Sequence, residues 1–151
     1  EYVATTVAAY SEALSAICDG TFTDDRIAEW DSRLEKIFNR GYWNGYYLGQ
    51  RLGEWSSKYG SSATRTKIYQ AKGVRYFSNI GVAEFRMESG ELNVGDEIVI
   101  TGPTTGAIIM TVDEIRVNLK TVQKTVKGES FSIKTTEKIR PSDRLYLWAR
   151  T

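Results

Sequence analysis

The sequence predicts an α+β fold in which an N-terminal helical hairpin is followed by a small antiparallel β-barrel of six or seven strands. The prediction rests on a change in the spacing of apolar residues. They recur every three or four positions at first, as in an amphipathic helix, and at alternate positions later, as in a strand. We therefore expect a helical hairpin over residues 1–38, an aromatic connector and linker over 39–66, and the barrel over 67–151.

The first predicted helix carries a stripe of large apolar side chains. These are Val3, Val7, Tyr10, Leu14 and Ile17. Asp19-Gly20 ends the helix, because glycine suits the left-handed conformation that follows a helix C-terminus. The single cysteine, Cys18, lies where the stripe ends. We expect it to be a small buried residue rather than a reactive thiol.

The second predicted helix begins after Thr23, whose hydroxyl is a good N-cap. Asp24 and Asp25 occupy its first turn, where negative charge is favourable at the positive end of the helix dipole. Its apolar face consists of Ile27, Trp30, Leu34, Ile37 and Phe38. Because the link between the two helices is short, we expect them to pack as an antiparallel hairpin.

Glycine and aromatic residues alternate without a helical period after the second helix. The candidate binding residues of this connector are Arg40, Tyr42, Trp43, Tyr46 and Tyr47. Arginine and aromatic side chains dominate binding hot spots, which favours a docking or ligand surface. Large rings also bury much area when they fill a seam inside a protein, and the sequence leaves both interpretations open. Residues 55–66 are rich in Ser, Gly and Lys and predict an exposed linker.

From Lys67 onward the alternation of apolar and polar residues predicts strands. One alternating face contains Ala83, Phe85, Met87, Ile98, Ile100, Ile108, Met110, Val112, Ile115, Val117, Leu119, Phe131, Ile133, Leu145 and Leu147. Turn residues separate the runs, and the absence of predicted helices between them excludes parallel βαβ units. The sequence therefore predicts an antiparallel sheet.

Two segments of the predicted barrel echo each other. Residues 92–100 and 139–147 share an apolar residue, a tight turn, an aspartate and then an alternating strand. Asp96 and Asp143 can each accept hydrogen bonds from the backbone amides of their own turn, so we interpret them as structural. The predicted structural turn residues are Gly95, Asp96, Gly102, Pro103 and Asp143. Such Gly-Asp entries resemble the second-domain barrel of translation elongation factors.

The residue types present exclude several kinds of chemistry within this chain. There is no histidine, which removes Ser-His and Cys-His nucleophile activation and His-ligated zinc. The pairs Asp24-Asp25 and Asp113-Glu114 are interpreted as helix-start and solvated strand-end residues. We therefore predict no catalytic residue, no metal site and no cofactor. The net charge of +1 gives no general attraction for nucleic acid or anionic lipid.

The expected location is the cytoplasm. A lone cysteine cannot form an intrachain disulfide framework, and no apolar stretch is long enough to span a bilayer. The chain starts Glu1-Tyr2-Val3 without an initiator methionine, so we expect a piece of a longer protein.

Three stretches together resemble the C-terminal region of the collagenase-like peptidases, peptidase family U32. They are residues 2–14, the segment Asn39-Arg40-Gly41-Tyr42 with Gly45 to Gly49, and the turn residues 95–103 with Arg140 and Asp143. The resemblance implies an upstream α/β barrel that carries the catalytic unit, whose paired-cysteine signature this chain lacks. It also implies relatives that hydroxylate RNA or act in the ubiquinone pathway with iron-sulfur clusters, which Cys18 alone cannot hold.

We expect a non-catalytic accessory domain of a collagenase-like peptidase, which positions substrate or stabilises the upstream catalytic domain. By itself this chain should be inactive. One alternative is a module that positions an RNA substrate. It rests on Lys67, Lys72, Arg75, Arg86, Lys120, Lys124, Lys127 and Lys134, with Tyr69, Tyr76 and Phe77 beside several of them. The second alternative is a purely structural or oligomerising cap. The expected partners are the upstream domain and a protein or RNA substrate, with no membrane.

Overall fold

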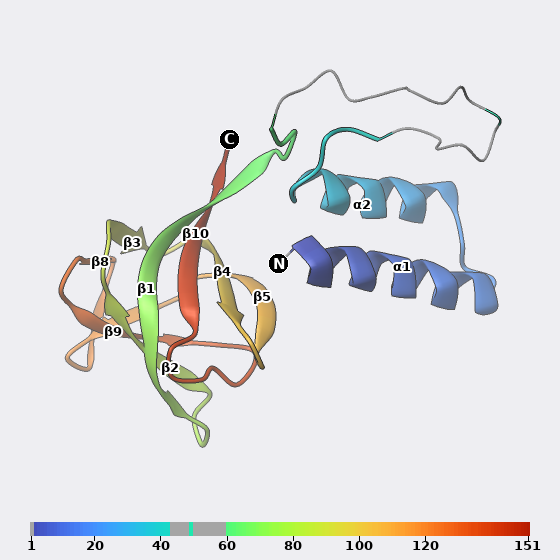
Figure 1. Cartoon of the computed structure of the whole chain (residues 1–151). Helices are drawn as coiled ribbons and strands as arrows, with labels where there is room; N and C mark the ends of the chain where they lie inside the picture. The colour runs from blue at the N-terminus through green and yellow to red at the C-terminus, as the bar shows by residue number, and fades with distance from the viewer. Residues whose placement is uncertain (1, 43–48, 50–59) are drawn as a thin grey trace. The chain divides into compact units, whose positions relative to one another are not determined.

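The fold was analysed in a computed structural model, which describes residues 2–42, 49 and 60–151. The chain divides into two compact units, a helical unit over Tyr2–Thr66 and a β unit over Lys67–Arg150. In the described residues two helices precede ten strands, so the predicted α+β class is confirmed (Figure 1). The division into a hairpin, a connector and a barrel as separate domains stays a prediction.

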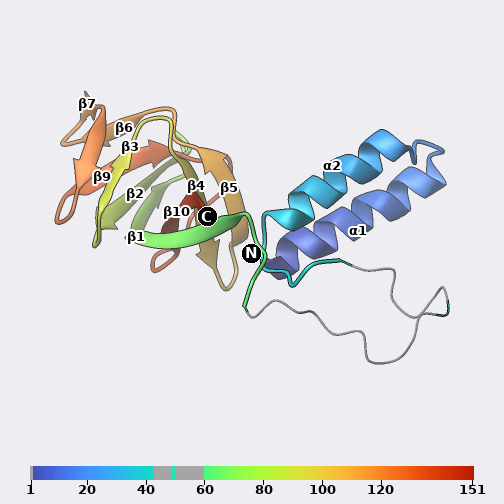
Figure 2. The same cartoon turned by 90° about the horizontal axis from the view of Figure 1, so that it is seen from above.

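The helical unit is an antiparallel pair of helices, α1 (Tyr2–Cys18) and α2 (Asp24–Glu35), which lie side by side in Figures 1 and 2. Gly20, at φ +68°, adopts the left-handed conformation after α1. Thr23 then caps α2, because its Oγ1 accepts a hydrogen bond from Arg26 N at 3.4 Å. Each helix therefore ends or begins at a residue suited to that position.

Small side chains of α1 form the interface between the helices. Ala9 and Ala16 are buried with Trp30 of α2 in one apolar cluster, and Ala13, Ile27 and Leu34 pack against it. Alanines seven residues apart lie on one face of a helix, and their small size leaves room for the indole ring. This complementarity of small and large side chains closes the hairpin.

A polar clamp fastens the same interface at its edge. Glu12 accepts two hydrogen bonds from Arg33, with Nη1 at 2.5 Å from Oε2 and Nη2 at 3.0 Å from Oε1. Trp30 Nε1 donates a third hydrogen bond to Glu12 Oε2 at 3.0 Å. These bonds to Arg33 and then Trp30 lower the pKa of Glu12 below its ordinary value of 4.5. The clamp therefore favours the ionised carboxylate.

The large apolar stripe of α1 is not part of this interface. Its five side chains are 59–66% exposed: Val3, Val7, Tyr10, Leu14 and Ile17. The prediction that Cys18 is buried is wrong, because its side chain is exposed. Cys18 follows the buried Ala16 by two residues, a step that carries a helical side chain to the opposite side of the helix.

The β unit consists of ten short to medium strands within the described residues. They are β1 (Arg65–Phe77), β2 (Val82–Met87), β3 (Glu91–Asn93), β4 (Glu97–Gly102), β5 (Gly106–Thr111), β6 (Ile115–Val117), β7 (Lys120–Val122), β8 (Lys124–Val126), β9 (Ser130–Lys134) and β10 (Arg144–Arg150). The strand number is thus larger than the six or seven predicted, because the short strands β3, β7 and β8 have too few residues to show an alternation.

Eight strands form one sheet in the order β5-β4-β10-β1-β2-β9-β6-β7, and β3 and β8 form a separate pair. Strands β5 and β7 stand at the two ends of this order, so the described pairings do not close the large sheet into a barrel. The long strand β1 neighbours β10 and β2, and its register with β2 shifts between Gly73 and Arg75. Such an irregularity bends a strand and increases its twist.

The core of the β unit follows the predicted alternation closely. Phe85 of β2 and Phe131 of β9 are directly paired, with their rings stacked at a centroid distance of 5.7 Å. The fully buried core also contains Ala71, Ala83, Met87, Leu92, Ile98, Ile100, Val112, Ile115, Ile133, Ile139 and Leu145. Leu119 departs from the prediction, because it is 93% exposed and has φ +64°. It lies in the tight turn between β6 and β7, where the alternation of a strand no longer applies.

The Glu12 clamp predicts an acid-dependent loss of stability in the helical unit. A carboxylate whose pKa is lowered on folding stabilises above its unfolded pKa, and this contribution disappears as pH falls through the folded pKa. We expect Glu12→Gln to lower the free energy of unfolding by ~0.5 kcal/mol at neutral pH, a value typical of a partly exposed ion pair. The difference between native chain and variant should shrink as the pH falls below 4.5 and vanish once the pH is below the lowered pKa of Glu12, as measured by urea unfolding followed by far-UV circular dichroism.

The partner variant Arg33→Gln provides the control. In a double-mutant cycle the two substitutions should be non-additive at neutral pH and additive in acid, because protonation of Glu12 removes the shared interaction. A difference between native chain and Glu12→Gln that stays constant from neutral to acid pH would contradict this role.

Candidate functional site

The connector residues proposed as a binding site are only partly within the described residues. Asn39 turns the chain after α2, because its Nδ2 donates to Ile37 O at 2.9 Å and its Oδ1 accepts from Gly41 N at 3.1 Å. Tyr42 is 59% exposed next to this turn, and Arg40 lies within it. Trp43, Tyr46 and Tyr47 lie outside the described residues. Whether the connector is a binding face or a packed seam stays a prediction.

The two aspartate turns have the same hydrogen-bond geometry. Asp96 Oδ2 accepts from the backbone N of Asn93 at 2.8 Å, and Asp143 Oδ2 accepts from the backbone N of Arg140, also at 2.8 Å. The residue before each aspartate has positive φ, +95° at Gly95 and +75° at Ser142. In both turns the carboxylate accepts from the backbone N three residues earlier. This hydrogen bond closes the loop that leads into the next strand.

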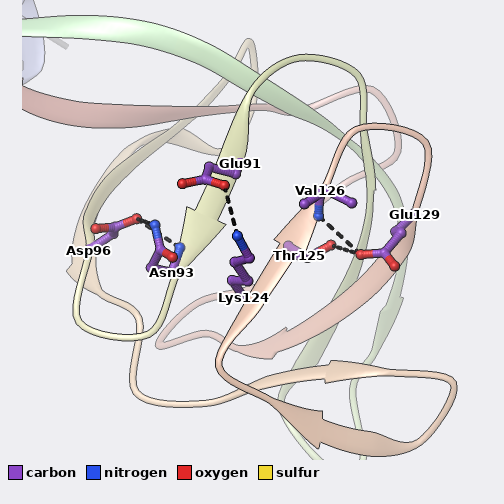
Figure 3. A network of polar contacts seen from close by, with 7 residues as sticks. All are labelled: Glu91, Asn93, Asp96, Lys124, Thr125, Val126 and Glu129. Atoms are coloured by element: carbon purple, nitrogen blue, oxygen red, sulfur yellow. Dashed lines mark hydrogen bonds and ion pairs between the residues drawn. The ribbon is translucent and has the colours of Figure 1, made fainter.

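Figure 3 shows the Asp96 turn beside the β3–β8 pair. Lys124 Nζ and Glu91 Oε2 are 3.3 Å apart across the two strands. Glu129 Oε2 accepts from Thr125 Oγ1 and from Val126 N, each at 3.0 Å. Each carboxylate in this network serves the local backbone or the neighbouring strand, so we assign the network no chemistry.

Asp143 holds a second, more deeply buried network. Its Oδ2 accepts from Thr105 Oγ1 at 2.6 Å, and Arg140 Nη1 donates to the same Thr105 oxygen at 3.1 Å. A Cβ at Gly102 would lie 1.8 Å from Asp143 Oδ1, so the predicted turn residue Gly102 must be glycine for this approach. Pro103 follows it in the β4–β5 turn. The carboxylate thereby ties the turn before β10 to the turn between β4 and β5.

The backbone of β1 joins the same network at Gly73. Gly73 N donates to Asp143 O at 2.7 Å, and Ser142 N donates to Gly73 O at 2.9 Å. A Cβ at Gly73 would lie 2.9 Å from Arg140 O, closer than side-chain contacts allow. Residues 140–143 therefore rest directly against β1, which fixes the start of β10 relative to that strand.

A surface pocket of about 600 Å³ lies where β10 packs beside β1. It is lined by Tyr69, Lys72, Glu88, Ser142, Arg144 and Tyr146. The rings of Tyr69 and Tyr146 meet edge to face at a centroid distance of 5.6 Å. Tyr69 and Lys72 are among the basic and aromatic residues singled out from the sequence, whereas Tyr146 is not. Its position between Leu145 and Leu147, in the alternating pattern of β10, was the signal for it.

Glu88 and Lys67 hold the two rings in place. Tyr69 Oη donates to Glu88 Oε2 at 2.5 Å, and Lys67 Nζ lies 4.8 Å from the centroid of the Tyr146 ring. Burial, and then the hydrogen bond to Glu88 and its charge, raise the pKa of Tyr69 to about 12. The Tyr69 hydroxyl thus stays protonated near neutral pH and remains a donor to the carboxylate.

The described residues offer neither a cluster of metal ligands nor a membrane-spanning helix. No group of three or more Cys, Asp or Glu side chains in residues 2–42, 49 and 60–151 is placed to hold a metal ion. In that part of the chain neither helix has the length and apolar character needed to cross a membrane.

Comparison with known proteins gives three results. A model of peptidase family U32 matches residues 1–57. A protein named collagenase from Porphyromonas gingivalis is 61% identical over 146 residues, which are 97% of this chain and 35% of that protein. Among solved structures, the C-terminal domain of a Geobacillus thermoleovorans protein assigned to the U32 peptidases has a TM-score of 0.51 at 13% identity, over 55% of this chain and 93% of that chain.

The chain spans 35% and 40% of the length of the two collagenase relatives from Porphyromonas gingivalis. The bacterial selenocysteine-specific elongation factor EF-Sec is also similar, with a TM-score of 0.39 over 55% of this chain and 14% of that chain. The likeness to the Geobacillus domain shows the fold alone.

The aspartate turns predict a graded loss of stability. Asp143→Ala leaves Arg140 N and Thr105 Oγ1 without their acceptor in a site where Asp143 is 2% exposed. We expect this variant to lose ~2–3 kcal/mol of unfolding free energy, the cost of unsatisfied buried donors. Asp96→Ala, in a more exposed turn, should lose ~0.5–2 kcal/mol. Urea unfolding followed by tryptophan fluorescence measures both.

Two further variants control this comparison. Asp143→Asn keeps one acceptor oxygen and should lose less than Asp143→Ala. Asp113→Ala removes an exposed carboxylate and should stay within ~0.5 kcal/mol of the native chain. The structural role of Asp143 would be refuted by an Asp143→Ala midpoint equal to that of Asp113→Ala.

Proposed function

Because the family match and the collagenase relatives confirm the resemblance to peptidase family U32, we propose that this chain is a non-catalytic accessory region of a collagenase-like peptidase. In this proposal the helical unit docks on the rest of the enzyme, which carries the catalytic groups. The β unit positions a protein substrate. The cytoplasmic location expected from the sequence belongs to the same proposal.

The observation that carries the proposal is the exposed apolar stripe of α1. Tyr10 and Leu14, at its centre, are 66% and 65% exposed, although α1 already packs against α2 through another face. Burying one large apolar side chain completely is worth about 1.5–3 kcal/mol. Side chains of this size aligned along a whole helix therefore favour a stable partner on that face.

The comparisons supply a specific partner for the stripe. Both helices lie within residues 1–57, which match the U32 model, whereas the β unit follows that range. The collagenase relatives are more than twice as long as this chain, since it spans 35% and 40% of them. These facts support a proposal in which the remainder of the U32 domain packs against the apolar stripe of α1.

The proposal leaves the described carboxylate networks without a catalytic role. Glu12, Asp96 and Asp143 each accept hydrogen bonds that close a local structure. A protein substrate is inferred from the relatives named collagenase. The aromatic and basic pocket of the β unit is the surface that we assign to substrate contact, because rings held by neighbouring side chains bind with little ordering cost.

One observation favours the alternative of an RNA substrate. Lys72 of β1 and Arg86 of β2 are directly opposite each other and both exposed. Like charges in this position destabilise a sheet, and a bound anion such as a phosphate would relieve the repulsion. The Glu88 carboxylate in the adjoining pocket opposes a phosphate chain, which is why we prefer a polypeptide.

The docking proposal predicts that polar substitutions in the stripe lower the stability of the long enzyme and leave the stability of the isolated chain unchanged. Tyr10→Ser combined with Leu14→Ser should leave the unfolding free energy of the isolated chain within ~0.5 kcal/mol, as surface changes do. In the full-length collagenase relative, the matching substitutions should lower the melting temperature of the domain that contains residues 1–57. Differential scanning calorimetry on both proteins provides the measurement.

A buried-face variant serves as the control. Ala9→Leu overpacks the α1–α2 interface and should destabilise the isolated chain by ~1–3 kcal/mol as well as the long enzyme. If the isolated chain is a dimer that Leu14→Ser disperses, the stripe binds a second copy and the docking proposal is wrong. Gelatin cleavage by the purified isolated chain would contradict the non-catalytic assignment.

A further inference from the structure

We propose that the β unit forms a two-fold symmetric dimer in which Leu119 of each copy enters a surface hollow beside Leu119 of the other copy. The inference is independent of the proposed function, because it concerns the face of β2, β9 and β6 rather than the α1 stripe or the Tyr69–Tyr146 pocket. A strained and exposed leucine, the hollow next to it and the charges around that hollow carry the proposal.

Leu119 occupies a position that is unfavourable for a leucine in two ways. Strands β6 and β7 form a hairpin at one end of the large sheet (Figure 2), and its two turn residues have positive φ, +51° at Asn118 and +64° at Leu119. Such turns favour glycine at the second position, because a Cβ crowds the backbone in the left-handed conformation. The leucine is also 93% exposed. A side chain that is both strained and exposed contributes little to its own fold, which favours a contact with a partner.

A hollow of about 660 Å³ lies next to Leu119 on the side of β9 that faces away from the core. Ser130 and Ser132 of β9 line it. Glu84 of β2 and Arg116 of β6 lie directly opposite Ser132 on the two neighbouring strands and also line the hollow. The sheet is hollowed here because the two serines are much shorter than the side chains on both sides of them.

Apolar side chains border the hollow on both sides of β9. Phe77 and Ile80 come from the β1–β2 hairpin, where Ile80 is 64% exposed, and Leu119 comes from the β6–β7 hairpin. A leucine that entered the hollow would bury its own apolar surface together with that of this border. Since Leu119 belongs to the border, the inserting side chain and the hollow lie on one patch. A patch of this kind is complementary to itself across a two-fold axis, and the assembly closes at two copies.

The charges around the hollow also match a second copy. Its charged lining residues are two acidic and two basic side chains, so their charges cancel. Glu114 and Arg116 pair with each other, with Oε1 2.9 Å from Nε. Glu84 and Lys134 have no ion-pair partner within residues 2–42, 49 and 60–151. A two-fold axis can place Glu84 of each copy beside Lys134 of the other, whereas a nucleic acid would leave Glu84 facing phosphates.

Sedimentation equilibrium of the whole chain tests the proposal. Tyr10→Ser and Leu14→Ser are introduced first, so that the apolar stripe of α1 cannot cause association. We expect this stripe variant to form a reversible dimer as its concentration rises. Adding Leu119→Gly should raise the dissociation constant ~10-fold or more, as loss of a central anchor does.

The melting temperature separates loss of the dimer from loss of the fold. In dilute solution, where the chain is monomeric, Leu119→Gly should leave the melting temperature unchanged or higher, because glycine adopts a positive φ without strain. A substitution that merely unfolded the β unit would lower the melting temperature together with the affinity.

Two further variants assign the contact to the hollow. Ser132→Gln fills the hollow without touching Leu119 and should weaken the dimer as Leu119→Gly does. Ile109→Ser is the matched control, because it removes an exposed apolar side chain from β5 at the other end of the sheet order. Its dissociation constant should equal that of the stripe variant.

Glu84→Lys and Lys134→Glu test the two-fold symmetry. Each substitution alone should weaken its own dimer, because it sets like charges against each other. In an equal mixture, one copy carries two lysines that face two glutamates of the other copy, so a mixed dimer should form with about the affinity of the stripe variant. Labelling one of the two variants with a fluorophore at the exposed Cys18 lets sedimentation detect the mixed dimer.

Three results would overturn the inference. They are a stripe variant that stays monomeric at millimolar concentration, a dimer that neither Leu119→Gly nor Ser132→Gln weakens, and a mixture of the two charge variants that associates no better than each variant alone. The first result would also show that any dimer of the native chain forms through the α1 stripe. Failure of the docking proposal is separate, because it appears in the long enzyme and leaves the dimer of the stripe variant intact.

Discussion

The buried carboxylate of Asp143 is the constraint on which the β unit depends. It accepts hydrogen bonds from its own turn and from Thr105 beyond β4, while its backbone carbonyl accepts from Gly73 of β1. Three segments far apart in the chain therefore meet at one residue that is 2% exposed. Glycine at positions 73 and 102 is required, because a Cβ at either would collide with this turn.

The same constraint places the candidate binding surface. Ser142 and Arg144 flank Asp143 in the chain and line the pocket, and Tyr146 follows two residues later on the same face of β10. Holding this turn against β1 brings Tyr146 within ring contact of Tyr69. The structural aspartate and the candidate pocket are therefore neighbours, so a change at Asp143 should alter both the stability of the β unit and the geometry of the pocket.

In the helical unit, one set of α1 side chains packs against α2 and a different set is exposed. Small alanines and Trp30 build the interface of the hairpin, with the Glu12 clamp at its edge, and the larger apolar side chains of α1 remain exposed. A hairpin that is closed by one face of a helix keeps the other face available for a partner. The proposed partner of that face is the rest of the U32 domain, because the helical unit lies within the residues that match the U32 model.

Local spacing in the sequence determined the element types and most of the β core, because burial on one face imposes a period of two on strands and about 3.6 on helices. Phe85, Phe131 and Ile98 follow from that period alone. The short strands, the exposed Leu119 and the open sheet order do not, since a strand of three residues shows no period and pairing joins distant segments.

Only the tertiary structure decided which face of α1 is buried and which tyrosines meet. Hydrophobicity favoured the stripe with Tyr10 and Leu14, but close packing against Trp30 required the small Ala9 and Ala16. Tyr69 and Tyr146 become neighbours because β1 and β10 are adjacent in the sheet. The sequence specifies whether a residue prefers to be buried. Which residue it then contacts depends on the shape and the hydrogen bonds of segments far away along the chain.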